Sequence, residues 1–187
     1  MSNLTKNALE NSLKKMLLKK KVNKITVEDL TNDCGINRMT FYYHFHDIYD
    51  LIEWSCLEDA KKAIKGKKTY DTWQEGCYQI FEAVLENKPF IMNVYKNVSR
   101  EHIEKFLNEL TYNLMMSVIN EKSKDIEVRE EDKEFIANFY KNAFVGLMLD
   151  WIGDDMKEDP KRIIKKLSIL VHGNIVEALD QFNKEDK

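Results

Sequence analysis

The residues best suited to contact another molecule lie near the amino end of this sequence. Arg38 can bind guanine through two parallel hydrogen bonds, and hydroxyls such as those of Tyr42 and Tyr43 commonly bind phosphate oxygens. Thr40 adds a small polar group beside them. The candidate DNA-binding residues are Lys24, Thr26, Asn37, Arg38, Met39, Thr40, Tyr42, Tyr43 and His46.

Two short helices are predicted to position these side chains. Apolar residues recur at helical spacing from Val27 to Cys34, which predicts a first helix with one apolar side. Thr26 precedes it as an N-cap, and Gly35 supplies the positive φ angle that ends it. Asn37 is a second N-cap, so a second helix should begin at the next residue.

The second helix is predicted to have a buried side and an open side. Phe41 and Phe45 lie one turn apart and should face the interior, which leaves Tyr42 and Tyr43 on the open side. The alternative for the two tyrosines is ordinary packing. An open polar and aromatic face on the second of two short helices is typical of a helix-turn-helix, whose second helix enters the major groove.

Several of these residues together resemble the signature of the TetR family of transcription regulators. The matching segments are Ile25-Thr26-Val27, Gly35-Ile36-Asn37, Thr40-Phe41-Tyr42, His44-Phe45 and Leu51. One position departs from the pattern, because Ile48 stands where the family usually has a lysine. A phosphate contact at the start of the following helix is therefore not expected from this chain.

The resemblance implies a homodimer that binds double-stranded operator DNA in a sequence-specific manner. It implies repression as the commoner outcome, controlled by an unknown small-molecule effector, with a partner coactivator protein as the alternative controller. Residues 139–151 also resemble the C-terminal domain of a subgroup that includes regulators of dihydroxyacetone kinase genes. That second resemblance implies only the fold and the mode of pairing.

Charge divides unevenly along the chain, although the total is only −3. Residues 1–46 hold eight basic and four acidic residues, a net +4, and the remainder is −7. Basic residues favour binding to DNA because they release its condensed counterions. Hydrophobic residues make up 43% of the chain, with only two prolines and six glycines, which predicts an all-α fold.

The expected organisation is a small DNA-binding head followed by a larger helical domain. The helix-turn-helix domain is placed at residues 1–50, with a linking helix over 47–65. A charged connector at 65–69 then leads into a dimerisation and effector-binding domain at 66–187. Apolar spacing predicts that the last helix runs without interruption over 160–182.

The last two predicted helices carry apolar faces that look too wide for one neighbour. This width favours a homodimer interface in which both copies use the same surface. The alternative is a thick core within one chain. The candidate interface residues are Phe144, Leu147, Met148, Ile164, Leu167, Val171 and Ile175.

Aromatic, methionine and histidine side chains in the larger domain are candidates for an effector pocket. Such residues at helical spacing more often pack in a core than line a cavity, so the effector pocket is a hypothesis that rests on residue type alone. The candidate pocket residues are Trp73, Cys77, Tyr95, His102, Phe106, Met115, Phe139 and Trp151.

No catalytic, cofactor or metal site is predicted. The sequence contains no glycine-rich phosphate loop, no nucleophile elbow and no His-x-x-x-His pair. Its three cysteines lack metal-binding spacing and are read as reduced, packed thiols. With neither a signal segment nor a membrane span in view, the expected location is the cytoplasm.

Overall fold

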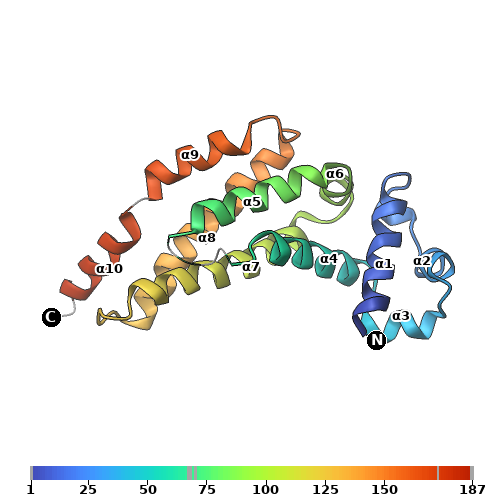
Figure 1. Cartoon of the computed structure of the whole chain (residues 1–187), viewed down its shortest axis with the longest axis horizontal. Coiled ribbons are helices and arrows are strands. Elements are labelled where there is room, and N and C mark those ends of the chain that lie inside the picture. The colour runs from blue at the N-terminus through green and yellow to red at the C-terminus, as the bar shows by residue number, and fades with distance from the viewer. Residues whose placement is uncertain (1, 67–68, 70, 172, 186–187) are drawn as a thin grey trace.

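The computed structural model describes residues 2–66, 69, 71–171 and 173–185. Helices make up this part of the chain and no strand occurs in it, so the predicted all-α fold is confirmed. A small group of helices lies at one end of an elongated molecule, and the C-terminal helix lies at the other (Figure 1). None of the described helices is both long and apolar enough to cross a membrane.

The head, defined here as the segment from α1 to α3, begins the chain. Its buried side chains come from every helix of the head, among them Leu13, Leu30 and Phe41, each 0% exposed. The three helices therefore share one apolar centre. The elements are α1 (Ser2–Leu17), the 3₁₀ turn η1 (Val22–Lys24), α2 (Val27–Cys34) and α3 (Arg38–His44).

Local sequence signals set the ends of α2 and α3. The Thr26 hydroxyl accepts a hydrogen bond from the Asp29 backbone N–H at 3.1 Å, and the Asp29 carboxylate accepts one from the Thr26 N–H at 2.9 Å. Hydrogen bonds from the backbone and the side chain of Thr26 hold the pKa of Asp29 below its usual value. Gly35, with φ 65°, ends α2. Both predicted helix ends are confirmed.

Replacing Gly35 by alanine should destabilise the head. A Cβ atom added there would meet nothing within 4 Å, so the cost comes only from the left-handed backbone. That conformation costs most residues about 1–2 kcal/mol and asparagine less. Denaturant unfolding should show a clear loss of stability for Gly35→Ala and a smaller one for Gly35→Asn. Equal stability of wild type and Gly35→Ala would contradict this account.

Helix α4 leads from the head into the body, where the described residues form six further helices. α7 and α8 pack along each other, and α9 lies against α5 (Figure 1). The 3₁₀ turn η1 between α1 and α2 was not predicted, whereas the predicted linking helix over 47–65 recurs as α4. The bounds are α4 (Ile48–Ala63), α5 (Trp73–Glu86), α6 (Lys88–Asn97), α7 (Arg100–Lys122), α8 (Glu130–Gly153), α9 (Pro160–Val171) and α10 (Asn174–Glu185).

The apolar centre of the head continues into the body instead of stopping at α4. Phe90 and Val94 of α6 are buried in the same cluster as Phe41 and Leu51. Two further clusters lie in the body, one around Phe81 and one at the far end of the molecule. The head is therefore packed on α6 as well as on α4, so a movement of α6 would reach the head directly.

The predicted single helix over residues 160–182 is wrong. The chain forms α9 and α10 instead, with Gly173 at the break in a left-handed conformation, φ 83°. Apolar spacing continues across the break, which is why periodicity alone missed it. In the predicted connector at 65–69, Lys67 and Lys68 lie outside the described residues. The division into domains at residue 66 stays a prediction.

Candidate nucleic-acid interface

The outer face of α3 is open to solvent. Met39, Tyr42 and Tyr43 are 76%, 47% and 82% exposed, whereas Phe41 on the opposite side is completely buried. Their exposure follows from the helical repeat. Because the Phe41 side chain points into the core, the side chains of its neighbours point toward solvent. The aromatic residues on this face are therefore free to contact another molecule.

Arg38 lies at the start of this face, one turn before Tyr42. A hydrogen bond with Tyr42 raises the pKa of Arg38 above its usual value, so the guanidinium stays charged at any physiological pH. At the other end, His46 is exposed and its backbone N–H donates to Asp50 at 2.9 Å. The Arg38 guanidinium group and the His46 imidazole ring thus flank the exposed aromatic residues.

The remaining predicted contact residues lie around the helix starts. Asn37 accepts hydrogen bonds through Oδ1 from the Thr40 backbone N–H at 2.8 Å and from the Thr40 hydroxyl at 3.1 Å. Thr26 is likewise occupied as the cap of α2, and Lys24 is exposed on η1. All nine predicted positions are exposed or partly exposed, with Asn37, Thr40 and Thr26 also stabilising the helices. Their contact with DNA stays a prediction.

A cavity of about 110 Å³ lies in the body, between α4, α5, α6, α7 and α8. Three of the predicted pocket residues line it: Tyr95, His102 and Phe106. Its α4 wall, which includes Tyr49 and Cys56, was not predicted, because no residue of the linking helix was a candidate for the pocket. Burial raises the pKa of the Cys56 thiol to about 12, so this group is not a ready thiolate.

The other predicted pocket residues lie elsewhere. Trp73, Cys77 and Met115 line a second cavity of about 30 Å³. Trp151 is 6% exposed and packs against Phe81 with ring centroids 4.9 Å apart, so it belongs to the core. Phe139 is 62% exposed on α8. The prediction of one pocket from all eight residues is therefore wrong.

Most of the predicted dimer residues are buried within the single chain. Met148, Ile164, Leu167 and Ile175 are at most 9% exposed, because α5, α8, α9 and α10 cover them. They cannot form an interface with a second copy, which corrects the prediction for these four. Phe144 is partly buried beside Phe81, Val171 packs against the far cluster, and Leu147 is 42% exposed.

One side chain of the body binds the backbone of the head. The Asn93 amide group donates to the carbonyl oxygens of Leu17 at 2.8 Å and Lys20 at 2.7 Å. Its oxygen accepts the Val22 backbone N–H at 3.2 Å. Asn93 therefore supplies hydrogen-bond partners for the backbone groups at and just after the C-terminal end of α1. It joins that end to α6, which lines the cavity.

The chain matches a family model described as TetR_C_8, transcriptional regulator C-terminal region, over residues 71–173. Its sequence is 24% identical over 168 residues to the HTH-type dhaKLM operon transcriptional activator DhaS of Lactococcus lactis subsp. lactis (strain IL1403). That alignment covers 88% of this chain and 89% of the relative.

Solved structures show the same fold. The dihydroxyacetone kinase operon activator DhaS has a TM-score of 0.69 at 20% identity, with 95% of this chain and 97% of that chain covered. NalD, described as the secondary repressor of the MexAB-OprM multidrug efflux pump in Pseudomonas aeruginosa, has a TM-score of 0.57 at 15% identity, covering 90% and 94%. The TetR family repressor AlkX from Dietzia sp. strain DQ12-45-1b has a TM-score of 0.54 at 15% identity, covering 95% and 96%.

The helical head and the open face of α3 have the geometry of a helix-turn-helix protein. Because the family model covers more than half of its length, the chain belongs to the TetR family of transcription regulators. The resemblance seen in the first fifty residues is thereby confirmed from an independent part of the chain. The matched family and relatives are regulators rather than enzymes.

Proposed function

We propose that the chain binds double-stranded operator DNA in a sequence-specific manner as a homodimer, and that a small-molecule effector controls this binding. The observation that carries the proposal is the exposed face of α3, on which Arg38, Tyr42 and Tyr43 stand free of the core. The basic charge of the head supports the same partner, because phosphate contacts supply much of the affinity of such proteins.

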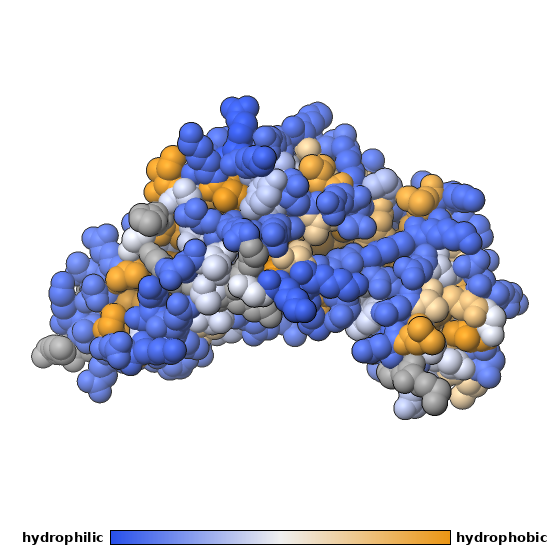
Figure 2. Space-filling view, in the orientation of Figure 1, coloured by the Kyte–Doolittle hydropathy of each residue, from blue (hydrophilic) through white to orange (hydrophobic). Residues whose placement is uncertain are grey.

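Exposed apolar side chains on the body support pairing of two copies. On α8, Phe135, Phe139 and Leu147 are 64%, 62% and 42% exposed and follow one another at helical spacing. On α9, Ile169 and Leu170 are 72% and 67% exposed, and Figure 2 shows apolar side chains over this helix. Large exposed apolar residues of this kind mark interaction surfaces. A dimer would carry two heads, one for each half-site.

The cavity in the body supports control by a small molecule. It is enclosed mainly by apolar side chains, which is typical of effector sites, and α4 and α6 connect its walls to the head. A ligand that prefers one arrangement of these helices would change the affinity for DNA. Repression follows if operator binding blocks transcription until the ligand releases it.

Activation with a partner coactivator protein is the second candidate, favoured by the likeness to DhaS, which is named an activator. Transcription in vitro from a promoter carrying the operator distinguishes repression from activation. Repression lowers the amount of RNA when the chain alone is added. Activation raises it, either with the chain alone or with its partner protein.

Selection from random double-stranded oligonucleotides tests the DNA-binding proposal. We expect enrichment of a sequence with two related half-sites, and binding that weakens steeply with salt. The slope of log affinity against log salt should be about −0.9 for each phosphate contacted. No enriched sequence, or binding that does not respond to salt, would contradict the proposal.

A further inference from the structure

The larger cavity has two acidic residues on its wall. Glu53 and Asp59 of α4 line it, and none of the described lining residues is a lysine or an arginine. His102 is exposed, with Nδ1 3.1 Å from the Ser99 hydroxyl. An anionic ligand would lose its hydration beside two carboxylates, which is unfavourable. The wall therefore favours a neutral or cationic ligand.

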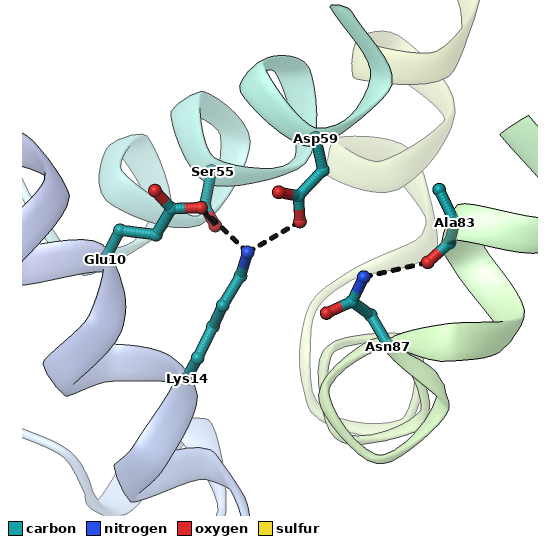
Figure 3. A network of polar contacts seen from close by, with 6 residues as sticks. All are labelled: Glu10, Lys14, Ser55, Asp59, Ala83 and Asn87. Carbon is teal, nitrogen blue, oxygen red and sulfur yellow. Dashed lines mark hydrogen bonds and ion pairs between the residues drawn. The ribbon is translucent and has the colours of Figure 1, made fainter. Parts of the chain in front are cut away.

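Asp59 also belongs to a polar network that joins the cavity wall to the head. Its Oδ2 atom lies 2.6 Å from Nζ of Lys14, which lies 2.7 Å from Oε1 of Glu10 (Figure 3). The same Glu10 oxygen accepts a hydrogen bond from the Ser55 hydroxyl at 3.0 Å. Lys14 and Glu10 are on α1, whereas Ser55 and Asp59 are on α4. The network thus connects α1 to the helix that lines the cavity.

Two carboxylates hold the Lys14 ammonium group. Its side chain is 24% exposed, and it lies over the Phe90 ring, 5.8 Å from the centroid. Burial lowers the pKa of Lys14, but hydrogen bonds to Asp59 and Glu10 outweigh it and leave the pKa above its usual value. If Asp59 were lost, Glu10 would still bind the ammonium. The Lys14–Asp59 contact can therefore break without leaving the ammonium group unpaired, and Asp59 then becomes available to another cation.

We infer that the cavity binds a mainly apolar ligand with one cationic end, and that this end takes Asp59 from Lys14. The inference rests on the proposed control by an effector. Once Asp59 pairs with the ligand, α1 loses a contact with α4. Asn93 still holds the carbonyl groups of Leu17 and Lys20, so α1 pivots about its C-terminal end. Operator binding weakens because the heads no longer keep one spacing.

Three compounds with the same phenylpropyl group test the class of ligand: 3-phenylpropylamine, 3-phenylpropan-1-ol and 4-phenylbutanoate. Calorimetry and thermal shift on the full chain should show the amine binding most tightly and the carboxylate most weakly. The amine should bind roughly tenfold or more tighter than the carboxylate, as expected for a hydrogen-bonded charge. Carboxylate binding equal to amine binding would overturn the inference.

Two substitutions should shift amine binding in opposite directions. Asp59→Asn should weaken it, because the anionic partner is gone, whereas Lys14→Met should strengthen it, because the competing cation is gone. Binding of the alcohol should change little in either variant. Lys15→Met is the matched control, since Lys15 pairs at 3.5 Å with exposed Asp33 and does not line the cavity. A purely structural role would move both variants in one direction.

Lys14→Gln provides a second variant if Lys14→Met does not fold, because the amide still donates to carboxylates without competing as a cation. It too should strengthen amine binding. Weaker amine binding in every folded Lys14 variant, or unchanged binding in Asp59→Asn, would overturn the inference.

The effect on the head is measured with the selected DNA. Saturating amine should weaken binding of the wild type by roughly 5- to 150-fold and have little effect on Asp59→Asn. If the wild type binds DNA but saturating amine leaves its affinity unchanged, the coupling is overturned while the proposed DNA-binding function stands. If the wild type binds no DNA without ligand, the proposed function fails, and the order of amine and carboxylate still tests the ligand class.

Discussion

Arg38→Ala weakens binding to the selected operator by roughly 5- to 150-fold, the expected loss of about 1–3 kcal/mol for a good contact to a base. The physical reason is the position of Arg38 at the exposed start of α3, where recognition helices meet base edges. Fluorescence anisotropy with labelled operator DNA measures the loss. The fold should be retained, because α3 is held by the buried Phe41 side chain and by the Asn37 cap instead.

Arg100→Ala is the matched control for this prediction. Arg100 is also exposed, and it pairs with Glu104 at 2.6 Å on α7 in the body. The substitution Arg100→Ala removes the same charge from the chain and leaves the head unchanged. Operator affinity that falls equally in both variants would show a general effect of charge, and unchanged affinity in Arg38→Ala would contradict the assignment of Arg38.

The head could be predicted from sequence because its signals are local. Thr26 and Asn37 cap the helices that follow them, and Gly35 ends α2, each through contacts within a few residues. Phe41 and Phe45 then face the interior by helical spacing alone. Such features are visible in one short segment, which explains why both helix boundaries and the open face of α3 were found.

The body could be predicted only in part, because its packing involves distant segments. Periodicity identified apolar faces on α8 and α9 but not what covers them. Met148 and Ile164 are covered by the same chain, whereas Phe139 is left open. The cavity poses the same difficulty, since its walls come from α4 to α8 and its shape depends on how five helices fit together. Neither property is encoded within one helix.

Phe139→Glu should convert the proposed dimer to a monomer and produce a larger loss of operator affinity than Arg38→Ala. Phe139 is 62% exposed in the single chain, so the fold should lose no more than about 0.5 kcal/mol. In a dimer, each copy would place an unpaired carboxylate in an apolar interface. Losing simultaneous binding of two heads costs roughly 10²- to 10⁴-fold in affinity. Light scattering measures the mass, and anisotropy measures the affinity.

Two further variants show whether the α8 face is responsible. Asn113→Glu adds the same charge at an exposed position on α7 and should leave the dimer intact. Gly146→Leu tests the face by bulk instead of charge, because an added Cβ atom at Gly146 meets nothing within 4 Å in the single chain. Leucine also favours the helix by about 0.8 kcal/mol over glycine, so dissociation would reflect a blocked approach of the partner helix. A dimer that survives both Phe139→Glu and Gly146→Leu would place the pairing surface elsewhere on the body.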